Sequence, residues 1–287
     1  MPVVVSVAIE WGHLLVEFFF NEDIASHFAG QGLDNFARLW DLKLDWFEPL
    51  NERRNGWSGV SRYRLSGDQP LQVFIKRQQN HNTRQFMHPI RGVPTFRREY
   101  HNILMFRSYG IPTLTPIYYG ERRVDGNDQA ILITLALDGY ENLFDWYCKM
   151  ALNQSEQSEE AIRAVLAAIA RVVRKLNDQG MAHYCLYPKH IFVLVQEVAT
   201  PYGDQDYERI RLIDLEKARY QPFSHIRRFK DLGCFMRHAQ HFSLAHIRYL
   251  LDCYFEGNTV LGGKRLHQRL LKALVTKQAQ SPGFYQD

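Results

Sequence analysis

The pattern of hydrophobic and polar positions changes near residue 137 of the chain. Before that point, short apolar runs are separated by turns rich in glycine, proline and polar residues, an arrangement typical of β-strands. The turn at residues 66–70 joins two such runs and therefore predicts a hairpin. The runs that predict strands are Val60–Leu65, Leu71–Lys76, Ile117–Tyr119 and Ala130–Leu137.

Two helices are predicted among these strands. The first lies within Asp34–Leu44, where apolar residues recur at helical spacing. The second begins at Thr95 and ends before Gly110 and Pro112, because glycine and proline commonly follow the end of a helix. Its apolar face consists of Phe96, Tyr100, Ile103, Leu104 and Phe106.

The rest of the chain is mainly helical. Glu159–Gln179 carries apolar residues at i, i+3, i+4, i+7, i+11 and i+14, which places them on one face of a long helix closed by Gly180. Two short strands, Ile191–Val195 and Ile210–Ile213, follow, joined by a polar loop, and the chain is again mostly helical from Phe229. The order of elements predicts an α+β fold of two lobes. The helical stripe consists of Ile162, Val165, Leu166, Ile169, Val173 and Leu176.

The first twenty residues are apolar but fit neither a secretory signal nor a membrane-spanning helix. Glu10 and Glu17 interrupt the run and no Lys or Arg precedes it, whereas a signal needs a positive start and an unbroken apolar core. We expect one or two strands packed on the domain instead. The 46% hydrophobic and 23% charged residues are typical of a globular protein, and four cysteines without a CxxC pair favour a reducing compartment. These features predict a cytoplasmic protein.

The formal net charge of +4 conceals an uneven distribution. Residues 53–107 hold eleven Lys and Arg against two acidic residues, a net charge of +9, so the remainder of the chain carries −5. The overall balance is too mild to predict a nucleic-acid partner. The basic segment favours a smaller anionic ligand, such as nucleotide phosphates or a phosphorylated glycolipid, or an anionic membrane surface.

Three features of the first lobe have a chemical interpretation. Gly56 and Gly59, in the sequence Asn55-Gly-Trp-Ser-Gly-Val60, open a strand either as an ordinary hairpin turn or as a loop whose backbone approaches phosphates. Lys76 ends an apolar strand, where it is either solvated or, if the strand is covered, in need of an anionic partner. Glu99, 23 residues on, is either a surface charge or the carboxylate that orients Lys76, as in the protein-kinase Lys–Glu pair.

A fourth feature lies in the second lobe, in the segment from His183 to Asp214. A loop beginning at His183 is followed by a strand, a polar turn and a second strand that delivers Asp214. In protein kinases this succession brings the catalytic loop and the metal-binding aspartate to one point. His183 and His190 are seven residues apart, which is the His-to-Asn spacing of the kinase catalytic loop.

These features together resemble the lipopolysaccharide-core kinase family, the Kdo and heptose kinases of Gram-negative bacteria, and within it the InaA-like branch. The resemblance covers roughly residues 50–240 and implies a protein-kinase-like fold, with a small β-rich lobe, a helical lobe and an N-terminal extension. The expected division is therefore 1–45, 46–137 and 138–287. The stretches that carry the resemblance are Asn51–Val60, Phe74–Arg77, Arg91–Glu99, Cys185–Phe192 and Leu212–Arg219.

The resemblance also implies cofactors, partners and roles for single residues. It implies ATP and Mg²⁺ as cofactors and a core sugar or other anionic glycolipid as acceptor, on the cytoplasmic side of the inner membrane. Asp231 resembles the helix aspartate that supports the backbone of the catalytic loop. The implied roles are nucleotide phosphates for Gly56, Gly59, Lys76 and Glu99, catalysis for His183, Cys185 and Asp214, and Mg²⁺ for Asp214 and His190.

Two positions depart from the pattern expected of an active kinase of this family. The catalytic loop reads His183-Tyr184-Cys185 where His-x-Asp is expected, and a thiol is mostly protonated at neutral pH and cannot hold a sugar hydroxyl as a carboxylate does. His190 stands at the metal-binding Asn position, although Mg²⁺ prefers oxygen ligands. The His-x-Cys form resembles a trait of the InaA-like branch.

Two classes of function follow from these observations. The first is an ATP-dependent phosphotransferase acting on a lipopolysaccharide core sugar or related glycolipid, with a degenerate catalytic loop. The second is a pseudokinase, a nucleotide-binding or scaffolding protein of the envelope or acid-stress response. Two lesser alternatives are a metal pair at His238 and His241, which lacks a recognisable third ligand, and a nucleophilic Cys185 paired with His183 or His190.

Overall fold

The computed structural model describes residues 4–10, 13–53, 56–67, 70–85, 88–195, 209–256 and 263–280. Within the chain, Met1–Leu104 and Leu114–Asp138 form one compact unit, and Met105–Thr113 and Gly139–Asp287 form another. Three groups of residues singled out in the sequence lie outside the described part. They are Asn55 of the glycine turn, the hairpin residues 68 and 69, and the polar loop at 196–208.

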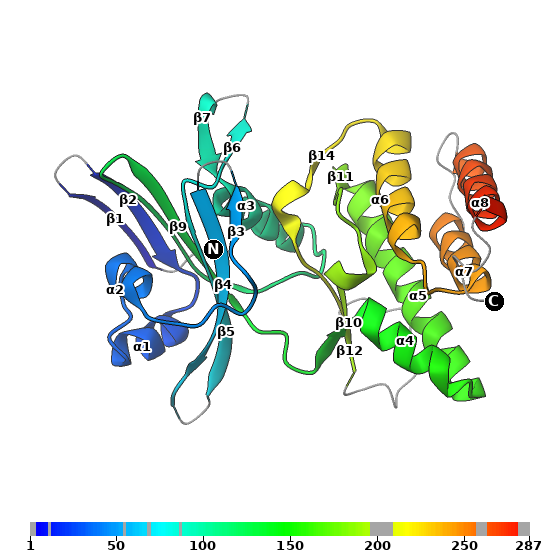
Figure 1. Ribbon diagram of the computed structural model, residues 1–287, viewed down its shortest axis with the longest axis horizontal. Coiled ribbons are helices and arrows are strands. Elements are labelled where there is room, and N and C mark those ends of the chain that lie inside the picture. The colour runs from blue at the N-terminus through cyan, green and yellow to red at the C-terminus, as the bar shows by residue number, and fades with distance from the viewer. Residues whose placement is uncertain are drawn as a thin grey trace. The chain divides into compact units, whose positions relative to one another are not determined.

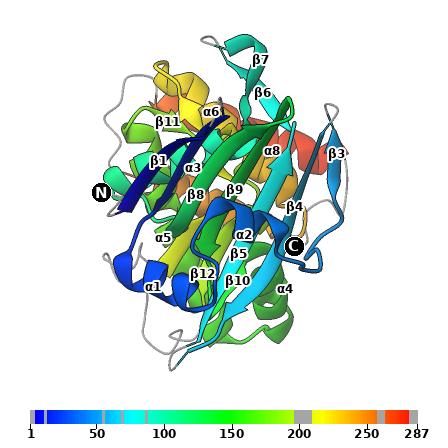
Figure 2. The same ribbon diagram turned by 90° about the vertical axis from the view of Figure 1, so that its left-hand side faces the viewer.

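The first unit contains a seven-stranded antiparallel sheet in the order β1-β2-β8-β9-β5-β4-β3, seen face-on in Figure 2. The predicted hairpin forms, with Val60 opposite Lys76 and Leu65 opposite Leu71. The first twenty residues contribute two strands, and β2 pairs with β8. The strands are β1 (Val4–Glu10), β2 (His13–Phe19), β3 (Asn51–Arg53), β4 (Gly56–Leu65), β5 (Leu71–Gln79), β8 (Pro116–Val124) and β9 (Asn127–Leu135).

Two short helices, α1 (Glu22–Gly30) and α2 (Phe36–Asp41), pack on one face of this sheet. Asn21 and Asn35 cap them, because each side-chain oxygen accepts a backbone N–H of the first helical turn. The predicted helix within Asp34–Leu44 is shorter than expected, since the carbonyls that end α2 accept hydrogen bonds from the Arg77 guanidinium instead. The core on this face includes Phe19, Phe28, Phe36, Leu39, Val73, Ile75, Ile131 and Ile133.

Helix α3 (Thr95–Ser108) lies against the opposite face of the sheet. Val73 and Ile75 of β5 belong to the core beneath α1 and α2, whereas Lys76 and Gln78 bond to α3. Neighbouring residues of a strand point to opposite faces, so α3 covers the other side. A separate hairpin, which the sequence analysis did not predict, connects β5 with α3 and projects from the sheet in Figure 1; it consists of β6 (Asn82–Gln85) and β7 (His88–Pro94).

The second unit is mainly helical, as the sequence predicts. All six residues of the predicted stripe on α5 are at most 2% exposed, and Ser155 caps that helix. The described part of this unit also contains a three-stranded sheet in the order β10-β12-β13 and a two-stranded sheet, β11-β14. The elements are β10 (Tyr140–Asn142), α4 (Leu143–Asn153), α5 (Glu156–Asp178), β11 (Met181–Ala182), η1 (Pro188–His190), β12 (Ile191–Leu194), β13 (Ile210–Leu212), η3 (Leu215–Lys217), β14 (Arg219–Tyr220), α6 (Ser224–His238), α7 (Leu244–Phe255) and α8 (Gly263–Gln280).

Gly180, predicted to close the long helix, adopts φ +79, a left-handed conformation that favours glycine. A Cβ at this position would lie 2.6 Å from Cε2 of Tyr220, so space as well as backbone conformation requires glycine. No helix within the described ranges is both long and apolar enough to cross a bilayer. The predicted α+β fold is confirmed.

The buried stripe of α5 gives a direct test of the packing. Leu166 is completely buried, whereas Leu152 near the end of α4 is 84% exposed. We expect Leu166→Ala to lower the free energy of unfolding by about 2–5 kcal/mol, because it leaves a cavity among packed side chains. Leu152→Ala, the matched control, should change it by no more than about 0.5 kcal/mol. Urea unfolding followed by circular dichroism measures both, and equal losses would contradict the assigned core.

Candidate functional site

Lys76 and Glu99 form an ion pair in the first unit. Nζ of Lys76 donates to Oε1 of Glu99 at 2.5 Å, and the side chains are only 18% and 4% exposed. The sequence analysis placed Lys76 at the end of its strand, but β5 continues to Gln79 and lies between β4 and β9. The lysine is therefore covered. Of the two alternatives for each residue, the structure supports the paired one, since a covered ammonium needs an anionic partner.

Polar contacts fix the beginning of α3 on the sheet, and with it the position of Glu99. The side-chain oxygen of Gln78 accepts hydrogen bonds from the Thr95 hydroxyl at 2.7 Å and from the Phe96 N–H at 2.9 Å. At the next residue, the Arg97 guanidinium makes two hydrogen bonds to the carboxylate of Glu121, at 2.8 and 2.6 Å. A fork-shaped contact of this kind restrains both position and orientation.

Gly56 and Gly59 have packing reasons to be glycine. A Cβ on Gly56 would lie 2.2 Å from the carbonyl oxygen of Gln79, and one on Gly59 would lie 2.5 Å from the ring of Trp46. Both residues belong to β4. A phosphate-covering role for these glycines stays a prediction.

In the second unit, the carboxylate of Asp231 on α6 organises the loop that begins at His183. Its oxygens accept the backbone N–H of His183 at 3.0 Å, the N–H of Tyr184 at 2.9 Å and the side-chain amide of Asn177 at 2.9 Å. Asp231 is fully buried, and burial raises its pKa to about 6, although the three donors favour the charged form.

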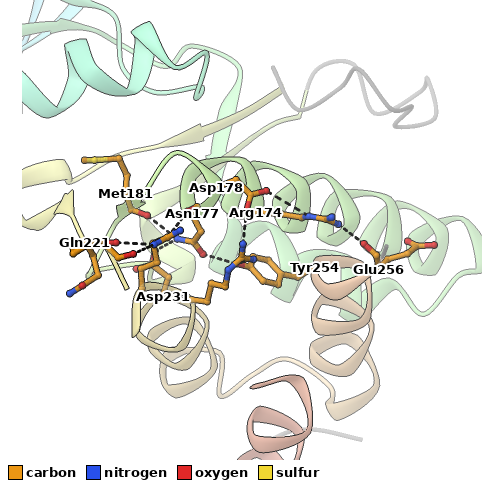
Figure 3. Close-up of polar contacts among 11 residues, drawn as sticks. Arg174, Asn177, Asp178, Met181, Gln221, Asp231, Tyr254 and Glu256 are labelled. Carbon is orange, nitrogen blue, oxygen red and sulfur yellow. Dashed lines mark hydrogen bonds and ion pairs between the residues drawn. The ribbon is translucent and has the colours of Figure 1, made fainter. Parts of the chain in front are cut away.

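Asn177 links Asp231 to a wider buried network, drawn in Figure 3. Its amide nitrogen also donates to the carbonyl of Met181, and its oxygen accepts the Tyr254 hydroxyl at 2.7 Å. Arg228 donates to the same hydroxyl and to Asp178. The sequence pattern alone does not single out Asn177. What distinguishes Asn177 in the sequence is that it is a polar residue on the apolar stripe of α5, four positions after Val173.

The ring of His183 joins the loop to the strand that delivers Asp214. Nε2 lies 3.0 Å from the carbonyl of Ile213, and because a carbonyl can only accept, Nε2 carries the proton. Nδ1 accepts the backbone N–H of Cys185 at 3.3 Å. Burial lowers the pKa of His183 to about 4. The imidazole is thus neutral at pH 7, with both nitrogens occupied by backbone groups.

Asp214 follows β13 in the left-handed region, at φ 58 and ψ 55, with its side chain 42% exposed. Nδ1 of His190 lies 3.3 Å from its Oδ2 and 2.9 Å from the carbonyl of Cys185. That nitrogen must carry a proton, since the carbonyl can only accept. Burial lowers the pKa of His190, against the opposing effect of Asp214. A metal ion could therefore reach His190 only through Nε2.

Cys185 is 2% exposed, and its Sγ lies 3.9 Å from the hydroxyl of Tyr187. His183 and His190 bond to its backbone rather than to its thiol, so the structure does not form the nucleophilic pair that the sequence left open. His238 and His241 contact the rings of Tyr187 and Phe144. Over the ranges that the structure describes, no group of three or more His, Cys, Asp and Glu is arranged to hold a metal ion.

The structure thus brings the predicted residues together in two groups, one in each unit. Lys76 and Glu99 are paired in the first. In the second, hydrogen bonds and the contact between His190 and Asp214 connect the residues of the loop and of the segments that support it. Those residues are His183, Cys185, His190, Asp214 and Asp231.

The chain matches a family profile and is similar to proteins of known sequence or structure. The sequence profile of the lipopolysaccharide kinase (Kdo/WaaP) family matches residues 37–254. Protein InaA of Escherichia coli (strain K12) is 31% identical over 188 residues, 65% of this chain and 79% of that protein. The solved structure of WaaP in complex with acyl carrier protein aligns with a TM-score of 0.59 at 21% identity, over 87% of this chain and 93% of that one. The BubR1 kinase domain aligns with a TM-score of 0.42 at 12% identity, over 92% and 97% of the two chains.

The neutral, buried imidazole of His183 predicts a pH dependence of stability. Its pKa of about 4 in the folded chain lies below the ordinary 6.5, so its contribution is full above pH 6.5 and is lost as the pH falls from 6.5 to 4. Between about pH 7.5 and about pH 4.5, the wild type should lose about 2–3 kcal/mol more unfolding free energy than His183→Gln. Asp231 is present in both proteins, so its own titration cancels in the difference.

Urea unfolding at a series of pH values measures this difference. His225→Gln, which removes an exposed histidine of α6, is the control and should follow the wild type. If His183→Gln also follows the wild type at every pH, the assignment of a neutral buried His183 is wrong.

Proposed function

The chain belongs to the lipopolysaccharide kinase (Kdo/WaaP) family, and from this premise we propose that it transfers the γ-phosphoryl group of ATP to a hydroxyl of a lipopolysaccharide core sugar or a related anionic glycolipid. The observation that carries the proposal is the covered Lys76–Glu99 pair. In kinases of this architecture the lysine binds nucleotide phosphates and the helix carboxylate orients it. The net charge of +9 over residues 53–107 supports an anionic ligand in this part of the chain.

Asp214 is proposed to hold Mg²⁺. Its partly exposed carboxylate offers hard oxygen ligands, and Mg²⁺ in such enzymes needs one or two carboxylates, completing its shell with phosphates and water. The residues present therefore fit this ion. His190, with a protonated Nδ1 beside Oδ2 of Asp214, orients the carboxylate. When bound, Mg²⁺ would neutralise negative charge on the phosphoryl group that is transferred.

Because position 185 is a cysteine, the chain lacks the carboxylate that would accept the proton of the sugar hydroxyl there. Phosphoryl transfer depends mainly on positioning and electrostatic stabilisation, so its absence slows the reaction without removing its other requirements. We therefore propose a slow phosphotransferase. The family name supports a lipopolysaccharide acceptor. We further propose that the reaction takes place at the cytoplasmic face of the inner membrane.

A pseudokinase is the second candidate function, and the observation that favours it is the buried thiol of Cys185 at the base position. Such a protein would bind nucleotide, or act only as a scaffold, without transferring phosphate. The kinase and the nucleotide-binding form of the pseudokinase share nucleotide binding and differ in phosphoryl transfer. Separate measurements of binding and transfer therefore distinguish them.

The first measurement is a calorimetric titration with ATP, with and without Mg²⁺. The wild type should bind ATP more tightly with Mg²⁺ present, and Lys76→Met should weaken binding roughly 10- to 100-fold, since it removes a charged hydrogen-bond donor. Asp214→Asn should lose only the increase in ATP affinity that Mg²⁺ causes. Lys230→Met, at an exposed position of α6, is the charge-matched control and should bind as the wild type does. Absence of nucleotide binding by the wild type would contradict the kinase and the nucleotide-binding pseudokinase, and would favour a scaffold.

The second measurement follows radiolabel from ATP into extracted core glycolipid. Cys185→Asp should raise the transfer rate roughly 10- to 100-fold, because it restores a carboxylate general base. Cys185→Ser, similar in size but uncharged, is the control and should not raise it. Retained ATP binding without transfer by the wild type or by Cys185→Asp would favour the pseudokinase.

A further inference from the structure

Strand β2 and the residue that follows it contribute two aromatic side chains to the face of the sheet that α3 covers. Glu17 and Phe19 point to the α1–α2 side, where Glu17 accepts the Phe36 N–H and Phe19 joins the core. Alternation along the strand places Phe18, and Phe20 just after it, on the opposite side. This part of the chain precedes residues 37–254, which match the family profile.

The aromatic residues form a continuous cluster with α3. The ring of Phe18 lies 5.3 Å from that of Tyr100 and 5.6 Å from that of Tyr119, and the ring of Phe20 lies 5.6 Å from Tyr100. Tyr100 and Tyr119 are stacked at 4.4 Å with an interplanar angle of 10°. Such contacts restrain the rings that take part in them, and Tyr100 directly follows Glu99.

Strand β8 connects these aromatic rings to the polar contact that Arg97 of α3 makes with Glu121. Phe18 lies opposite Tyr119 in the β2–β8 ladder, so the two rings are cross-strand neighbours. The Tyr119 hydroxyl donates to Glu121 at 2.7 Å, and Glu121 in turn accepts from Arg97. The residues of β2 and β8 thus contact α3 at Arg97, which precedes Glu99, and at Tyr100, which follows it.

We propose that the N-terminal strand β2 is a positioning element for the Lys76–Glu99 pair. Phe18 and Phe20 hold Tyr100 against the sheet, and this contact fixes the turn of α3 from which Glu99 reaches Lys76. The residues that precede the family match therefore support the orientation of the phosphate-binding lysine. The predicted effect on nucleotide binding rests on the proposed function. The restraint of α3 by β2 rests only on the contacts between these two elements.

The test compares the wild type with the double variant Phe18→Ala/Phe20→Ala, in the full chain. Phe19→Leu is the matched control, because Phe19 lies on the same strand but contacts Phe28 and Tyr118 on the opposite face. Hydrogen exchange of the backbone amides of Thr95–Ser108 should be accelerated about tenfold in the double variant. The control should leave these rates within about twofold of wild type, even where it lowers overall stability.

ATP titration then tests the consequence for the site. The double variant should raise the Kd for ATP about three- to tenfold, and the control should leave it within about twofold. In a Glu99→Gln background the double variant should have no further effect, because the helix carboxylate through which β2 acts is already absent. A purely structural role would lower the melting temperature of both strand variants without this difference in Kd.

Unchanged exchange of α3 in the double variant would overturn the inference, and so would an equal loss of ATP affinity with and without Glu99→Gln. If the wild type binds no ATP, the proposed function fails, while the exchange rates still decide whether β2 restrains α3. Should the double variant not fold, Phe20→Leu gives the same comparison, because it removes one ring contact with Tyr100 and keeps an apolar side chain.

Discussion

The buried carboxylate of Asp231 is the constraint on which the geometry of the second unit's site depends. A charge removed from water is costly unless donors replace the water. Here the donors are the backbone N–H groups of His183 and Tyr184 and the amide of Asn177, so the loop must turn its N–H groups toward one point. Tyr184 accordingly takes a left-handed conformation at φ 63. The solvation of one charge thereby fixes the start of the loop.

From there a closed set of bonds extends to Asp214. His183 holds the carbonyl of Ile213 through Nε2 and the N–H of Cys185 through Nδ1. The N–H of Ile213 donates to the carbonyl of His190, whose ring donates to the carbonyl of Cys185. Each bond has a backbone group at one end at least. The carboxylate of Asp214 therefore emerges from a frame that depends little on side chains other than the two histidines.

The sequence predicted those parts of the fold and site that depend on local patterns. The stripe of α5 and the β4–β5 hairpin follow from periodicity and turn residues. The pairing of Lys76 with Glu99 is one of two alternatives that the sequence leaves open, suggested by the kinase Lys–Glu pair, and the structure selects it. The end of α2 and the role of Asn177 depend on contacts between residues far apart in the chain, Arg77 with α2 and Asp231 with α5. No local pattern encodes such contacts, although a polar residue on an apolar stripe indicates that one is needed.

The two departures from the kinase pattern affect the site differently. At position 190 the ring supplies an N–H donor to the carbonyl of Cys185 and lies beside Asp214, and an asparagine could supply a donor of the same kind. At position 185 the side chain takes no part in the closed set of bonds, which uses only its N–H and carbonyl. Replacing aspartate by cysteine there changes the proton chemistry and leaves the frame intact. The proposed slow kinase and the proposed pseudokinase therefore share this architecture, and they differ in whether phosphoryl transfer proceeds without a carboxylate at position 185.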